Sequence, residues 1–259
     1  MSTEPEPQAP VPPPSEPRGF NISRGVALQL VGLRITFDDS GEPKLEIPAL
    51  NLRLDTSVHW LEIAMDHLAA AKAADAVLVA AHSEGKGLGD LQPTFKASMQ
   101  AIVASATFFE AIFAAARDRM PAARRAHFSA DGSGARRSRQ VTEQLKRSFG
   151  LKPEKVEQLA GLLSDLYRLR DEAVHPSSSF TPSVVHPQFG VLVENRFATY
   201  TFPHARFFVR IACAYCKILA IRGQKDGPKE VQELAQYMLD AGEPLFRAWE
   251  ESYGPLLDG

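Results

Sequence analysis

An arginine and a histidine stand five residues apart at the end of a segment whose hydrophobic spacing predicts a helix from Pro153 to His175. Arginine binds phosphate oxygens through a fixed fork of donors and stays protonated. Histidine titrates near neutral pH and can give or take a proton. Arg170 and His175 are therefore candidates for phosphoryl chemistry, and Asp171, four residues before His175, is a candidate for orienting the imidazole.

Arg170 falls among hydrophobic residues on a helical wheel of about 100° per residue. Leucines and a valine lie within about 80° of one another on this face: Leu159, Leu163, Leu166 and Val174. A guanidinium in such a stripe must be paired, or face an interface or a wet cleft, because an unpaired buried charge costs several kcal/mol. A salt bridge to Glu110 on a neighbouring helix and a functional position both stay open.

The position of His175 also allows a catalytic and a non-catalytic interpretation. On an ideal helix Arg170 and His175 are about 140° apart, so they converge only if the last turn unwinds or if a second copy contributes one of them. A histidine near a helix C-terminus also interacts favourably with the helix dipole without any catalytic role.

The string Leu169-Arg170-Asp171-Glu172-Ala173-Val174-His175-Pro176 resembles the defining motif of the HEPN superfamily. That motif is an arginine, a polar residue, a few variable residues and a histidine at a helix end. The alanine- and serine-rich segment 104–111 resembles the family's second helix, and Tyr200-Thr201-Phe202 resembles its continuation. The resemblance covers roughly residues 56–225 of the chain.

The resemblance implies a mainly α fold, a HEPN-type bundle of four to five helices that forms a homodimer in which two copies of the motif face each other. It implies a metal-independent endoribonuclease without a cofactor, with Arg170, His175 and Asp171 as catalytic residues and Glu110 supporting Arg170. Many family members act as toxins or antiphage effectors, which makes RNA and an antitoxin or regulatory protein the expected partners. The alternative is a catalytically inactive dimer that serves as a binding or scaffold module.

A basic segment, residues 117–147, carries nine positive and three negative side chains, which leaves a local charge of +6. Such a patch binds an RNA backbone by releasing counterions, and a solvated linker has the same composition. RNA binding without cleavage is therefore a third interpretation. The predicted RNA-binding residues are Arg124, Arg125, Arg136, Arg137 and Arg139.

The N-terminal part differs in composition and in period. Residues 1–19 are acidic and rich in proline, which predicts a disordered tail and no signal peptide. Residues 20–54 alternate in hydrophobicity around Leu33–Phe37 and Leu50–Leu54, with turn residues at Asp39-Ser40-Gly41. We therefore expect a small antiparallel β appendage of half-buried strands before a helical domain of residues 55–259.

Helical periodicity predicts further helices from about Thr56 to Ala81, from Pro93 to Pro121, from His204 to Ile221 and from Pro228 to Ala241, with a short helix after Pro244. Residues 176–203 are predicted to be loop-like, with a hairpin that pairs Val191–Val193 with Phe197–Phe202.

Composition excludes several classes of protein. The two cysteines, Cys213 and Cys216, predict no disulfide framework, and we expect a reducing, cytoplasmic location. The seven histidines show no metal-binding spacing, and no glycine-rich nucleotide loop occurs. The apolar run Ala101–Ala116 is short for a membrane span and contains Glu110, so no membrane location is expected.

Overall fold

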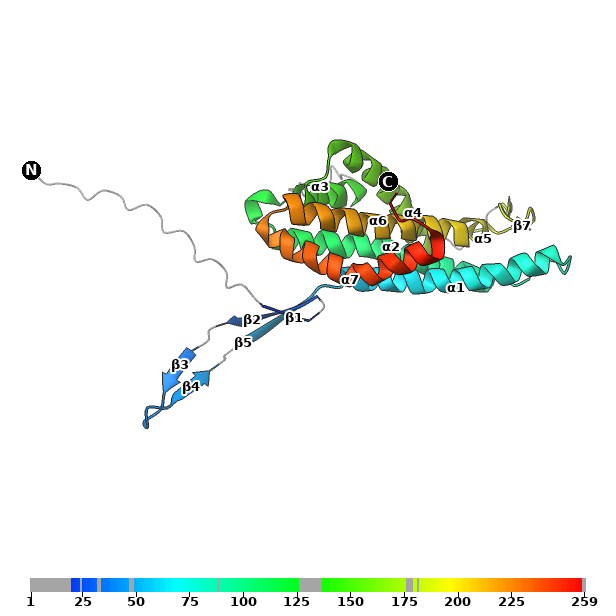
Figure 1. Cartoon of the computed structure of the whole chain (residues 1–259). Helices are drawn as coiled ribbons and strands as arrows, with labels where there is room; N and C mark the ends of the chain where they lie inside the picture. The colour runs from blue at the N-terminus through cyan, green and yellow to red at the C-terminus, as the bar shows by residue number, and fades with distance from the viewer. Residues whose placement is uncertain are drawn as a thin grey trace, which may run out of the picture. The chain divides into compact units, whose positions relative to one another are not determined.

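The computed structural model describes residues 20–23, 25–31, 34–46, 49–87, 89–125, 137–175, 179–180 and 182–257, so the predicted tail of residues 1–19 lies outside the described residues. Two compact units divide the chain, Met1–Leu54 and Asp55–Gly259. Figure 1 shows paired strands in the first unit and a bundle of helices in the second. The chain is therefore mainly helical, with short antiparallel strands near its N-terminus.

The described residues of the first unit form two antiparallel sheets. β1 (Phe20–Ser23), β2 (Val26–Val31) and β5 (Ala49–Leu54) lie in the order β1-β2-β5, and β3 (Arg34–Phe37) pairs with β4 (Pro43–Glu46). The turn between β3 and β4 contains the predicted turn residues. Asp38 Oδ1 accepts the backbone N–H of Ser40 at 2.9 Å, and Gly41 has a φ of 82°, which glycine adopts without a clash of Cβ.

The expected burial of these strands is wrong. Apolar side chains alternate along β3 and β5 as predicted, but Phe37 is 70% exposed and Leu52 is 65% exposed. Alternation fixes which side chains share a face and does not supply a layer to cover that face. Among the described residues of this unit no second layer covers it.

The second unit contains seven α-helices among its described residues. They are α1 (Ser57–Ser83), α2 (Gln92–Arg119), α3 (Arg137–Phe149), α4 (Pro153–Val174), α5 (Asn195–Thr199), α6 (Phe202–Asp226) and α7 (Lys229–Tyr253). A 3₁₀ turn, η1 (Ala122–Arg124), follows α2, and a short hairpin joins β6 (Val184–Val185) to β7 (Leu192–Val193).

Helix α2 lies at the centre of the bundle, because it contacts α1, α3, α4, α6 and α7 (Figure 1). Apolar residues at helical spacing on its inner face are buried, including Ile102, Phe109 and Phe113, while Phe95 and Met99 are partly buried. Among the described residues α2 alone is long and apolar enough to cross a membrane by length and composition, and 56% of its most apolar window is buried inside the protein. Its apolar side chains therefore form the core against which α4 packs.

Two predicted segments differ from the structure in their secondary structure. The basic segment is not a linker throughout, because α3 begins at Arg137 and buries Val141, Leu145 and Phe149. Residues 197–202 do not form a strand. They belong largely to α5 and to the start of α6, and β7 pairs with β6 instead.

Helix α7 runs without interruption through Pro244, where a break and a separate short helix were predicted. Proline removes one helical hydrogen bond and usually bends or ends a helix. Buried residues on both sides of it, Met238 before and Phe246 and Trp249 after, hold the two halves against the same core.

A buried carboxylate joins the start of α1 to the end of α2. Asp55 Oδ1 accepts hydrogen bonds from the backbone N–H of Ser57 at 3.0 Å and from its hydroxyl at 2.7 Å. Asp55 Oδ2 lies 3.3 Å from Arg119 Nη2, and the two side chains are only 2% and 9% exposed. Arg119, although it is in the basic segment, therefore belongs to a structural ion pair.

Candidate functional site

Helix α4 positions the arginine and the histidine of the motif. Leu159, Leu163 and Leu166 are buried as predicted, while Val174, assigned to the same stripe, is 55% exposed because the helix leaves the core at its last turn. Tyr200 fixes this end of α4: its hydroxyl donates to the backbone oxygen of Leu169 at 2.7 Å. Burial raises the pKa of Tyr200 to about 12, so the hydroxyl stays a donor at neutral pH.

The Arg170 guanidinium lies at the boundary between core and solvent, with 27% of its side chain exposed. Its Nε and Nη2 donate to Asp171 Oδ1 at 2.9 and 2.6 Å, and its Nη1 lies 3.7 Å from Glu110 Oε1. It also lies over the ring of Tyr167, 5.0 Å from the ring centroid. The predicted pairing of Arg170 with Glu110 is therefore confirmed, as a charge contact rather than a short hydrogen bond.

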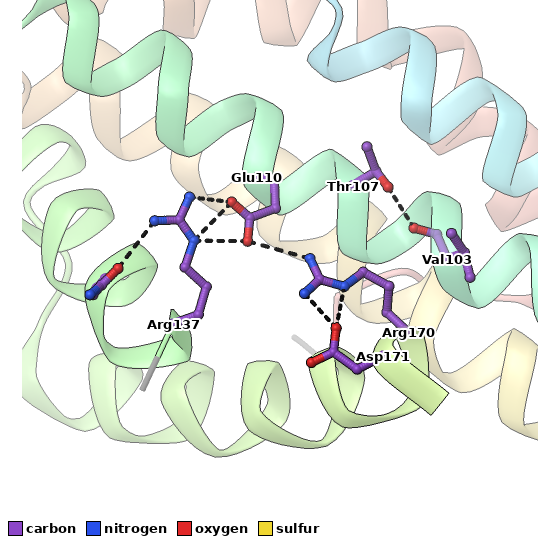
Figure 2. Close-up of polar contacts among 7 residues, drawn as sticks. Val103, Thr107, Glu110, Arg137, Arg170 and Asp171 are labelled. Carbon is purple, nitrogen blue, oxygen red and sulfur yellow. Dashed lines mark hydrogen bonds and ion pairs between the residues drawn. The ribbon is translucent and has the colours of Figure 1, made fainter. Parts of the chain in front are cut away.

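Arg137 binds the same carboxylate from α3, which brings together three helices at one point (Figure 2). Arg137 Nε donates to both oxygens of Glu110 at 3.0 Å each, and Arg137 Nη2 donates to Glu110 Oε2 as well. Its guanidinium stacks on Phe113, 4.3 Å from the ring centroid. The hydrogen bond to Glu110 raises the pKa of Arg137 above its usual value, so the Arg137 guanidinium stays charged.

Tyr167 closes the site from the buried side. It is only 5% exposed, and its hydroxyl has no hydrogen-bond partner among the described residues. Burial, with the nearby charge of Glu110 as a second cause, raises the pKa of Tyr167 far above its usual value. The site therefore consists of two guanidinium groups held by one shared carboxylate, above a neutral phenol.

His175 is not part of this cluster. Its backbone N–H donates to the backbone oxygen of Asp171 at 2.8 Å. Helix α4 therefore keeps its helical hydrogen bonding to the end, and the last turn does not unwind. The His175 ring is exposed and has no side-chain hydrogen bond or ion pair with another described residue. One chain alone therefore does not bring Arg170 and His175 together.

The structure corrects the role expected of Asp171. Its carboxylate binds Arg170 instead of orienting His175. Two nitrogens of the permanently charged guanidinium donate to this carboxylate, whereas a neutral imidazole would offer one donor without charge. The arginine therefore binds the carboxylate more strongly. Asp171 is therefore a residue that positions Arg170.

Two of the three predicted RNA-binding arginines with described side chains make contacts inside the chain. Arg125 donates from Nε to the backbone oxygen of Met120 at 2.9 Å, Arg137 binds Glu110, and Arg139 is exposed on α3. Arg136 and the side chain of Arg124 lie outside the described residues.

Sequence reasoning missed that Arg137 shares Glu110 with Arg170. The two residues Glu110 and Arg137 are 27 positions apart, and no short motif joins them. A signal was present, because the spacing of Val141, Leu145 and Phe149 by four residues marks one face of a helix that begins near Arg137. This helical face was not recognised because the segment is rich in arginine.

Comparison with protein-family models, with curated proteins and with solved structures finds no significant match to this chain.

Proposed function

We propose that this chain is a metal-independent endoribonuclease of HEPN type that acts as a homodimer. Arg170 of one copy and His175 of the other copy together form the site. One observation carries the proposal: α4 stays helical to its end, so the partly exposed Arg170 and the exposed His175 lie on different faces of one helix. A second copy of the motif supplies a histidine to Arg170 and an arginine to His175.

The chemistry follows from the two side chains. His175 takes the proton of an RNA 2′-hydroxyl, whose oxygen then bonds to the adjacent phosphorus while the bond to the 5′-oxygen breaks. Arg170 binds the phosphate oxygens and stabilises the charge that develops there. The 5′-oxygen takes a proton from a water molecule as it leaves, and the hydroxide that remains receives the proton held by His175. The products are a 2′,3′-cyclic phosphate and a 5′-hydroxyl.

The carboxylates around Arg170 hold its guanidinium in place before RNA arrives. Asp171 and Glu110 restrict its orientation, and Arg137 restricts Glu110 in turn. Such preorganised charge lowers the reorganisation needed when the phosphate becomes more negative. Exposed Arg139 is a candidate contact for the RNA backbone outside the site. A role as a toxin or antiphage effector, with an antitoxin or regulatory partner, agrees with this activity.

One observation favours a second candidate, an inactive dimeric scaffold. Arg170 already has two carboxylate partners inside its own chain, which satisfies its charge without any substrate. In a scaffold these ion pairs would shape the interface between copies, and RNA would neither bind nor be cut.

The proposal predicts that the purified protein cuts labelled single-stranded RNA or tRNA in the presence of EDTA. Arg170→Ala should lose this cleavage, since the guanidinium that binds the phosphate is gone. The measurement is product formation on a gel, with detection of 2′,3′-cyclic phosphate ends.

A matched control is Arg247→Ala, which removes an exposed arginine of α7 that pairs with Glu243 and lies outside the site. It should cut as the wild type does, and circular dichroism should show all three proteins folded. RNA that stays intact with the folded wild type would contradict the proposal and favour the scaffold.

A further inference from the structure

A surface groove lies on the side of α4 that faces α5 and α6, away from the Arg170–Glu110 cluster. It has a volume of about 450 Å³, within the range of pockets that hold small ligands. Apolar side chains and polar side chains from all three helices line it. The polar ones include Asp165, Arg168, Glu172, Asn195 and His204. No part of the proposed cleavage step uses these residues.

Two side chains of the groove offer hydrogen-bond acceptors that bind no other described residue. His204 Nδ1 lies 2.7 Å from the backbone oxygen of Thr199. Because a carbonyl only accepts, Nδ1 of the neutral ring carries the hydrogen and Nε2 is an acceptor. The Asp165 carboxylate makes no hydrogen bond or ion pair with another described residue. A ligand that fits these groups must donate hydrogen bonds.

The charge of the groove disfavours a phosphate there. Arg168 is its one arginine among the described lining residues, and its Nη1 donates to Glu172 at 2.8 Å. Asp165 then leaves the groove with a net negative charge when His204 is neutral. The occupant is therefore a neutral or cationic group with N–H donors.

An aromatic ring offers a flat surface beside these acceptors. Phe207 is 50% exposed although it is a large apolar residue, and its ring stands edge-on to Phe208 at 5.1 Å between centroids. Unpaired RNA bases stack on such rings and are read along their Watson–Crick edges.

The groove and His175 lie along one face of α4. Arg168, Glu172 and His175 are spaced by four and three residues, which places Arg168 and His175 about 20° apart on an ideal helix. A base in the groove would thus lie on the same face of the helix as the histidine.

We propose that this groove binds the base of an unpaired guanosine in single-stranded RNA. Guanine presents two adjacent donors, N1–H and the 2-amino group, which one carboxylate accepts together, and Asp165 supplies that carboxylate. Phe207 stacks on the base. The inference rests on the proposed function for its second consequence, that cleavage occurs next to guanosine.

The test uses RNA that cannot be cut, so that binding is measured apart from cleavage. Fluorescein-labelled hexamers with 2′-O-methyl riboses, UUGUUU, UUAUUU and UUIUUU (where I is inosine), are titrated with the full chain and followed by anisotropy. UUGUUU should bind more tightly than UUAUUU by about fivefold or more, the value of one bidentate contact. Inosine, which lacks the 2-amino group, should fall between them.

Three variants assign the effect to the groove. Asp165→Asn should remove the preference for guanosine, and Phe207→Ala should weaken all three hexamers by about fivefold or more. Asp66→Asn, which changes an exposed carboxylate on α1, should leave the preference for guanosine and the affinity for all three hexamers unchanged.

Equal affinity for the three hexamers, or a guanosine preference that survives Asp165→Asn, would overturn the inference. Tighter binding of an arginine-containing peptide than of UUGUUU would also overturn it and assign the groove to a protein partner. Guanosine preference without cleavage of ordinary RNA would refute the proposed function alone, and cleavage without base preference would refute the groove alone.

Discussion

His175→Ala is expected to lower the rate of RNA cleavage by about 10²- to 10⁴-fold, the usual contribution of one general acid or base. The free energy of unfolding should change by no more than about 0.5 kcal/mol, because the ring is exposed and has no side-chain partner among the described residues. The two measurements are single-turnover cleavage of labelled RNA and urea unfolding of the same preparations.

His67→Ala provides the control, since His67 is a partly buried histidine of α1 outside the motif. It should cut at the wild-type rate. Added imidazole should restore part of the activity of His175→Ala, because a small base can enter the space that the side chain leaves. Wild-type cleavage by His175→Ala would exclude this residue as the base.

Asp55→Ala is expected to lower the free energy of unfolding by about 3–5 kcal/mol. The substitution leaves the Arg119 guanidinium, with a side chain 9% exposed, without the carboxylate 3.3 Å away. It also removes the acceptor for the Ser57 N–H and hydroxyl at the start of α1. Urea denaturation followed by circular dichroism measures the change.

Two further variants separate the contributions. Asp55→Asn keeps an oxygen that can accept from Ser57 but removes the charge, so its loss should be smaller than that of Asp55→Ala. Glu243→Ala breaks an exposed ion pair with Arg247 and should cost less than about 1 kcal/mol. If Asp55→Ala cost no more than Glu243→Ala, the buried pair would have no net stabilising role.

The helices that the sequence predicts best are those with a continuous apolar stripe. Helix α2 and most of α4 follow their stripes, whose residues are buried or partly buried where the periodicity places them. Helix α3 was not predicted because charged and polar residues far outnumber its three apolar positions. Its stability comes from packing Val141 and Leu145 into a core that other helices form. The interruption predicted at Pro244 failed for the same reason, since tertiary packing outweighs one lost hydrogen bond.

The candidate site was predictable only in part. Periodicity identified Arg170 as a charge in an apolar stripe, and that contradiction led to Glu110 as its partner. The role of Arg137 depends on how α3 packs against α2, which no local pattern reports. The binding of Asp171 to Arg170 rather than to His175 is a competition between two donors, and it depends on side-chain geometry as well as on spacing.

The most direct test of a site shared between two copies is to mix two inactive variants, Arg170→Ala and His175→Ala, and to allow their subunits to exchange. Each mixed dimer then holds one site with an intact arginine from one copy and an intact histidine from the other. Since half of randomly paired dimers are mixed, the proposal predicts recovery of about a quarter of the wild-type cleavage rate. Activity that stays at the level of the separate variants would contradict the shared site.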